Sequence, residues 1–128
     1  MDIDHARAYI RDNHHAVMAT YRADGRPQLS PVVVGLDDDG TILLSTRESA
    51  YKTRNLRRDP RVALSLTAAD NPFEPIVIRG RVVEWLEGDE AWEVVDRIAA
   101  KYIGGPYPRD EERVVAVVEP ERQSVGVG

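Results

Sequence analysis

The residues with the clearest chemical potential form one short basic segment, from Lys52 to Arg61, which carries five lysine or arginine side chains. The whole chain has a net charge of −5, so this local excess of positive charge suggests an anion-binding site. A solvent-exposed helix face, balanced by acids elsewhere, is the alternative. At about 100° per residue, a helix places Lys52, Asn55 and Leu56 on one face. Leu56 should face the core, so Lys52 and Asn55 should lie at the edge of whatever the helix covers. The other basic residues should lie on the opposite, exposed face: Arg54, Arg57, Arg58 and Arg61.

Lys52 is expected in the first turn of this helix, where free backbone N–H groups and the positive end of the helix dipole add to its charge. The preceding residues Ile42–Thr46 have the pattern of a strand, and Arg47-Glu48-Ser49 has that of a loop, with Ser49 as a candidate helix cap. Together, a strand, a hydroxyl-rich loop and a helix opening with lysine offer many hydrogen-bond donors to a phosphorylated ligand. The segment therefore predicts a phosphate site, although it lacks the glycine-rich turn of a Walker loop.

No other part of the sequence has the residue types and spacing of a catalytic centre. The chain contains no cysteine, which excludes disulfides and thiolate chemistry. It also has no serine in a Gly-x-Ser-x-Gly setting and no spaced set of metal ligands. The acids of Asp37-Asp38-Asp39 are interpreted as a turn, those of Asp110-Glu111-Glu112 as solvated, and His14 and His15 as surface or capping residues. We therefore predict no metal site and no catalytic side chain, as suits a protein that orients a reactive cofactor.

The length and composition limit the classes of protein that the chain can belong to. Its 128 residues suffice for one domain, 1–128, with a single core. Apolar residues make up 42% and charged residues 30%, as in ordinary globular proteins. No apolar run approaches the roughly 20 residues of a membrane helix, and the acidic start differs from a signal peptide. The negative net charge argues against general nucleic-acid binding. We expect a cytoplasmic protein that binds neither a membrane nor nucleic acid.

The elements expected to position the basic helix are mostly short antiparallel strands. Asp24-Gly25 and Asp39-Gly40 are hairpin signals, because both residues of such a turn tolerate positive φ. Hydrophobic periodicity predicts the remaining elements, with Pro60 ending the basic helix. The predicted strands are His15–Tyr21, Pro27–Leu36, Thr41–Thr46, a strand through Val62, Leu64 and Leu66, Ile76–Trp85 with a bulge or bend at Gly80, and Val114–Val118. Asn71–Pro75 is expected to be a loop, and the other helices are Asp4–Asn13 and Asp89–Ile103, the latter stopped by Gly104-Gly105. Six strands and three helices predict a mainly β fold, a small barrel with flanking helices.

Several of these motifs resemble a known family. Asp24–Val32, Lys52–Leu64, Gly80-Arg81-Val82 and Tyr107–Val114 are similar to the coenzyme F420-dependent oxidoreductases of the pyridoxamine 5′-phosphate oxidase-like split β-barrel superfamily. The resemblance covers nearly the whole chain, and flavin-binding relatives share the barrel. It implies a six-stranded antiparallel split β-barrel that forms a homodimer, with two cofactor sites at the dimer interface. It also implies which residues line the deazaflavin ring, namely Gln28, Ser30, Pro31 and Val32. The residues that it implies for the ribityl phosphate and its neighbouring groups are Ser45, Thr46, Lys52, Thr53 and Asn55.

The activity implied by this resemblance is hydride transfer from reduced coenzyme F420 to an unsaturated small-molecule substrate. Family members often carry a second basic residue two positions before the lysine, where this chain has Ala50, so Arg47 or Arg54 is a candidate substitute. Tyr107 or Arg109 either reaches the cofactor pocket of the partner chain or serves only to lead into the final strand. Two alternatives remain, an FMN-binding oxidoreductase of the same fold and a non-catalytic protein that binds a cofactor or another phosphorylated aromatic ligand.

Overall fold

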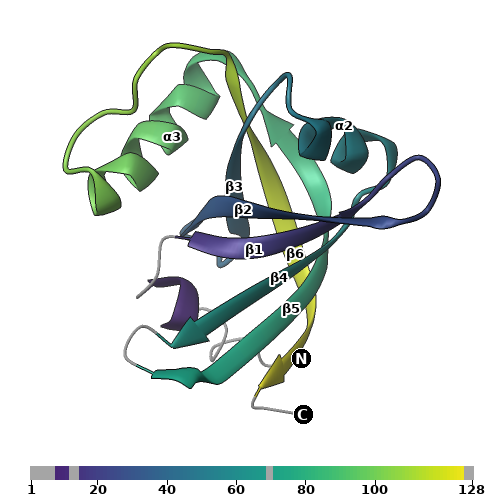
Figure 1. Ribbon diagram of the computed structural model, residues 1–128. Helices are drawn as coiled ribbons and strands as arrows, with labels where there is room; N and C mark the ends of the chain where they lie inside the picture. Colours follow the sequence, from purple (N-terminus) through teal and green to yellow (C-terminus); the bar gives the residue numbers. More distant parts are fainter. Residues whose placement is uncertain (1–7, 12–14, 69–70, 126–128) are drawn as a thin grey trace.

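The strands of this protein close into one antiparallel barrel, in the order β1-β2-β3-β6-β5-β4 (Figure 1). The computed structural model describes residues 8–11, 15–68 and 71–125. In chain order, the elements from β1 onward are β1 (His15–Tyr21), β2 (Pro27–Leu36), β3 (Ile42–Arg47), α2 (Tyr51–Arg58), β4 (Arg61–Ala68), β5 (Asn71–Leu86), α3 (Gly88–Tyr102) and β6 (Arg113–Val125). This arrangement confirms the predicted six-stranded antiparallel barrel with flanking helices.

The opening helix predicted at Asp4–Asn13 falls mostly outside the described residues. Residues 8–11 are helical, and Tyr9 and Ile10 are buried, as the predicted apolar face requires for Ile10. Across the described ranges, no helix combines the length and the hydropathy needed to span a membrane.

The two Asp-Gly hairpins form where they were predicted, between β1 and β2 and between β2 and β3. Gly25 and Gly40 have φ values of +86° and +85°, and no described residue other than glycine has a positive φ. Each glycine N–H donates to the carbonyl three residues earlier, that of Arg22 or Asp37. In each turn the aspartate precedes the left-handed position, and only the glycine occupies it. Asp39 instead accepts hydrogen bonds from the N–H and hydroxyl of Thr41.

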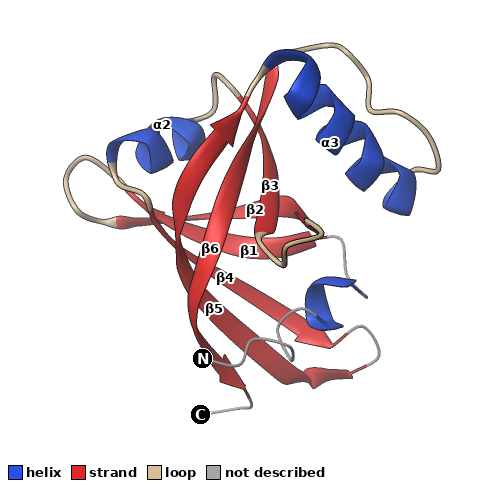
Figure 2. Cartoon of the chain, turned by 180° about the vertical axis from the view of Figure 1, so that it is seen from behind, coloured by secondary structure: helices blue, strands red, loops and turns tan. Residues whose placement is uncertain are grey.

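Two hydrophobic layers hold the barrel and its helices together. Strands β3 and β6 are apolar on both faces, which explains their continuous runs Ile42-Leu43-Leu44 and Val114–Val118. One face fills the barrel, where Leu56 of α2 joins the core. The other face packs against α3 through Leu43, Val115 and Val117, which meet Ala91, Val95 and Ile98. Figure 2 shows α2 and α3 near the same end of the barrel, on different sides of it.

Strands β5 and β6 are both longer than their sequence pattern predicts. The expected loop Asn71–Pro75 was wrong, since Asn71 pairs with Ala68 and Pro75 with Thr67 across an irregular register. Similarly, β6 continues past its predicted end at Val118 because it pairs with β5 as far as Val125. Polar residues can extend a strand when a neighbouring strand supplies the hydrogen bonds, and a periodicity argument does not detect them.

The predicted bulge at Gly80 is confirmed. The register between β5 and β6 shifts between Arg79 and Gly80, and Gly80 lies opposite Pro120. A Cβ atom at Gly80 would lie 2.4 Å from the carbonyl oxygen of Glu119. Only glycine allows the two backbones to approach this closely.

Candidate functional site

Helix α2 has the orientation that the sequence predicts. Leu56 is buried in the barrel core, Asn55 is buried beside it, and Lys52 is partly buried, whereas Arg54, Arg57 and Arg58 are exposed. The suggested cap at Ser49 was wrong: the N-cap residue is Ala50, which makes no side-chain hydrogen bond to the helix. Ala50 therefore leaves the first turn of α2 without a side-chain cap.

An open cavity of about 270 Å³ lies beside this first turn. It is lined by four of the predicted site residues and four others: Pro31, Val32, Ser45 and Lys52, with His15, Val33, Tyr107 and Arg113. Strand pairing explains the grouping, because His15 is opposite Val33 on β2, and Val33 is in turn opposite Ser45 on β3. We call this space the Lys52 cavity.

The ammonium group of Lys52 lies in an environment of excess positive charge. Its Nζ donates to the carbonyl oxygen of Pro31 over 3.4 Å. Burial lowers the pKa of Lys52, and the nearby charges of Arg113 and Arg47 lower it further. Among the described residues no carboxylate pairs with Lys52. A bound anion would stabilise the charged form of this lysine.

Arg113, the first residue of β6, is a second cation of the Lys52 cavity, and it was not among the predicted site residues. Its side chain is buried, with 9% relative exposure. Its Nε donates to the hydroxyl of Ser45 over 3.1 Å, and its Nη1 to the hydroxyl of Tyr107 over 3.4 Å. The sequence offered one signal for it: Arg113 stands two and four residues before Val115 and Val117, so strand alternation places it on the same face, the one that packs against α3. Arg113 comes to the cavity of Lys52 because it pairs with Arg47 where β6 runs beside β3.

Two predicted phosphate contacts, Thr46 and Thr53, lie away from the lining of the Lys52 cavity. Both are buried, and their hydroxyl oxygens are 3.1 Å apart. The hydroxyl of Thr53 also contacts the carbonyl oxygen of Arg47 over 2.6 Å, as donor. In this structure the two threonines fasten α2 to the end of β3.

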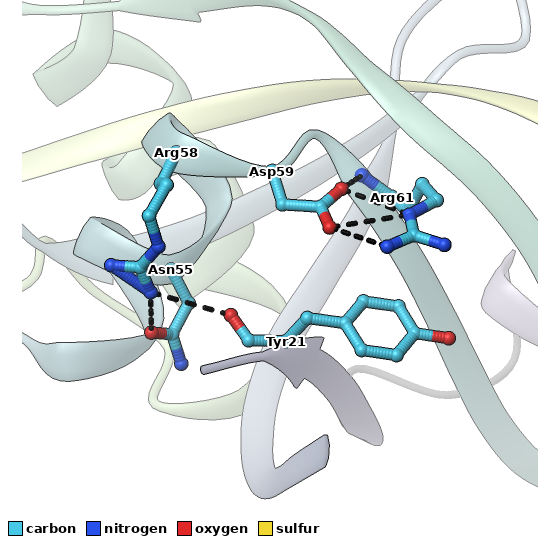
Figure 3. A network of polar contacts seen from close by, with 5 residues as sticks. All are labelled: Tyr21, Asn55, Arg58, Asp59 and Arg61. Carbon is cyan, nitrogen blue, oxygen red and sulfur yellow. Dashed lines mark hydrogen bonds and ion pairs between the residues drawn. The ribbon is translucent and has the colours of Figure 1, made fainter. Parts of the chain in front are cut away.

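Gln28 and Asn55 form a separate polar group on another side of α2. The Nδ2 of Asn55 donates to Oε1 of Gln28 over 2.9 Å and to the hydroxyl of Thr20 over 3.1 Å. Its Oδ1 accepts from Nη2 of Arg58 over 2.8 Å, and the same nitrogen reaches the carbonyl oxygen of Tyr21 (Figure 3). Gln28 and Asn55 line a second hollow of about 520 Å³, together with Arg22, Ala23, Asp24, Tyr51, Arg54 and Arg58. Ser30, also predicted to line the ring, contributes to neither space.

The segment between α3 and β6 is tied to its own chain. Arg109 makes a two-pronged ion pair with Asp96, at 2.6 and 2.7 Å, and lies 4.1 Å over the ring of Trp92. The backbone N–H of Tyr107 donates to the same Asp96 over 3.0 Å. These contacts account for Arg109 structurally and bring Tyr107 to the Lys52 cavity of its own chain. The suggestion that either residue reaches a partner chain stays a prediction.

A closed antiparallel barrel of this topology, with helices flanking it, defines a split β-barrel protein. The chain belongs to the pyridoxamine 5′-phosphate oxidase family, whose model matches residues 3–124.

Three solved structures illustrate the range of its relatives. An F420 reductase is 27% identical with a TM-score of 0.81, over 92% of this chain and 94% of that one. A conserved hypothetical protein from Mycobacterium tuberculosis is 25% identical with a TM-score of 0.79, over 98% of this chain and 84% of that one. A heme binding protein from Mycobacterium smegmatis is 27% identical with a TM-score of 0.69, over 94% of this chain but 51% of that one.

Proposed function

We propose that this protein is an oxidoreductase that binds coenzyme F420 in the Lys52 cavity and reduces an unsaturated small molecule. The observation that carries the proposal is the pair of cations, Lys52 and Arg113, which line one cavity with no acidic partner among the described residues. Such a donor set suits the phosphate of a nucleotide-like cofactor. The similarity to the F420 reductase, at 27% identity over nearly both chains, supports the choice of a deazaflavin.

In this proposal the chain binds and orients the cofactor, which supplies the hydride chemistry when bound. Lys52 and the uncapped first turn of α2 attract the phosphate. Ser45 can donate its hydroxyl hydrogen to the same group, since its oxygen already accepts from Arg113. Exposed Pro31 and half-buried Val33, both on β2, offer an apolar surface to the ring system. The bonds from Asn55 to Gln28 and between the two buried threonines keep α2, and with it Lys52, in position.

A homodimer is part of the proposal. Val17 of β1 and Leu29 of β2 lie on the outer face of the barrel, with 46% and 71% relative exposure. In the strand register Val17 is opposite Pro31, and Leu29 is opposite Ala19. Large exposed apolar side chains on one sheet face favour burial against a second copy. Sedimentation at micromolar concentration should detect a dimer, and Leu29→Glu should shift it toward monomer. A wild-type monomer would remove the shared-site part of the proposal.

Heme binding is a second candidate, which one observation favours specifically. His15 lines the Lys52 cavity together with two cations, and imidazole is a common axial ligand of heme iron. The heme binding protein of 27% identity adds to this candidate. FMN remains the alternative cofactor on the same barrel, because its phosphate requires the same cations. A non-catalytic cofactor-binding protein would use the same residues without turnover.

Side-by-side equilibrium titrations with coenzyme F420, FMN and heme test these candidates. We expect coenzyme F420 to bind most tightly, with Lys52→Ala weakening the complex. Yellow purified protein with flavin fluorescence would instead indicate FMN, and a Soret band lost in His15→Ala would indicate heme. Tight F420 binding without turnover across a panel of unsaturated substrates would indicate a binding protein. If none of the three binds, the proposed function is wrong.

A further inference from the structure

The Lys52 cavity has a second source of positive charge in an unexpected part of the chain. The resemblance to the oxidoreductase family leaves Ala50 where a second basic residue often stands, with Arg47 and Arg54 as candidate substitutes. Neither lines the cavity. Arg54 is exposed, with its guanidinium 4.4 Å over the ring of Tyr51. Arg47 is exposed as well, and its Nη1 lies 3.4 Å from a carboxylate oxygen of Glu111.

Arg113 differs from both in burial, and from Arg47 in having only neutral hydrogen-bond partners. It lines the cavity at 9% relative exposure, and its hydrogen-bond acceptors are the neutral hydroxyls of Ser45 and Tyr107. A guanidinium has five N–H donors, of which two are used here. In the described part of the chain, no carboxylate forms an ion pair with Arg113. Its guanidinium also lies 4.6 Å over the ring of Tyr107, and among the described residues no further hydrogen bond uses its remaining donors.

Burial of a cation without a counter-charge is unfavourable, and a second cation nearby adds repulsion. Burial lowers the pKa of Lys52 and the charge of Arg113 lowers it further, so the two groups share one electrostatic environment as well as one cavity. An arrangement of this kind is stabilised by an anion that contacts both groups. The flexible lysine offers a point charge, and the rigid fork of the arginine can bind two oxygens of one phosphate.

We propose that Arg113 is the second cation of the phosphate site, in place of the basic residue absent at position 50. A phosphate group is then bound from two sides, by Lys52 of α2 and by Arg113 of β6, with the Ser45 hydroxyl between them. As a statement about the cofactor, this inference rests on the proposed function. As a statement about an anion site, it is independent of which phosphorylated cofactor the protein binds.

Inorganic phosphate is the probe that isolates the anion site. We would measure the thermal midpoint of the full chain in phosphate against chloride of equal ionic strength, for wild type, Arg113→Gln, Lys52→Gln and Arg54→Gln. The Arg54 variant is the matched control, because it removes the same charge from the exposed side of α2. Phosphate should raise the midpoint of wild type and control equally, and most of that rise should be lost in the other two variants. An unchanged rise in Arg113→Gln would overturn the inference.

A second measurement uses wild-type protein and so does not depend on the folding of any variant. In a nitrogen-15 NMR titration with phosphate, the Arg113 Nε–H signal should move, while that of Arg109 should stay. A stationary Arg113 signal at saturating phosphate would also overturn the inference. The cofactor separates the two proposals. If phosphate acts through Arg113 but coenzyme F420 does not bind, the proposed function fails and the inference stands. If F420 binds and Arg113→Gln leaves its affinity unchanged, the inference fails and the proposed function stands.

Discussion

Substitution of Gly80 by alanine tests the close packing that closes the barrel. An added Cβ would lie 2.4 Å from the carbonyl oxygen of Glu119, and 3.1 Å from the Cα atom of Pro120. Both are backbone atoms, so no side chain can rotate away. Ordinary van der Waals contact begins at 3.4 Å, so β5 and β6 would have to move apart by about 1 Å at the bulge.

The expected cost follows from this displacement. Separation weakens the ladder hydrogen bonds next to the bulge, each with a net contribution of about 1 kcal/mol. Overpacking strain adds about 1–3 kcal/mol. We therefore expect Gly80→Ala to lower the free energy of unfolding by about 3 kcal/mol, which for a domain of this size shifts the thermal midpoint by roughly 10 °C.

Two other glycines provide graded controls. At Gly35 the added Cβ would lie 2.8 Å from Cγ1 of Ile98, a side chain on α3 that can repack, so Gly35→Ala should cost about 1 kcal/mol. At Gly25 nothing lies within 4 Å, and only the positive φ of +86° opposes alanine, again at about 1–2 kcal/mol. Urea unfolding followed by circular dichroism, at one fixed protein concentration, measures all three. If Gly80→Ala is as mild as Gly25→Ala, the β5–β6 contact at the bulge is not as close as described.

Three further predictions concern charged side chains. Lys52→Ala should reduce the affinity for a short-tailed coenzyme F420 about tenfold to a hundredfold, the range for hydrogen bonds to charged groups. Arg57→Ala should change this affinity little but lower the stability of the fold, because Arg57 bridges two glutamates. Equal losses of affinity in a fluorescence titration would contradict the orientation of α2. The hydrogen bond from Arg61 lowers the pKa of Asp59 to about 2, so the contribution of the ionised Asp59 to stability is present above pH 4 and lost as the pH falls toward 2. Asp59→Asn should flatten that part of a stability–pH curve. An unchanged curve would exclude the Asp59–Arg61 pair as the cause of the pH dependence. Arg109→Ala should speed proteolysis of the segment before β6, because it removes the ion pair with Asp96, and an unchanged rate of cleavage would contradict this structural role of Arg109.

The sequence by itself determined the local elements of the site. The orientation of α2 was predicted correctly, with Leu56 inward and the arginines outward, because helical periodicity is a property of neighbouring residues. Strand alternation could also have separated Ser45, which lines the cavity, from Thr46, which is buried beside Thr53, since adjacent strand residues face opposite sides. The turn positions followed from Asp-Gly as well. Their geometry did not, because a left-handed glycine serves more than one turn type.

Only the tertiary structure decided which residues of different strands lie opposite one another. The extra residues of β5 pair with β4 and those of β6 pair with β5, and these polar ends carry no apolar period that would predict them. Arg113 reaches Lys52 because β6 pairs with β3, two strands separated in sequence by α2, β4, β5 and α3. Sequence shows that a cation begins an apolar strand. Whether that cation faces an acid, solvent or a second cation depends on a register set by the burial of many distant side chains, and that register exists only in the folded barrel.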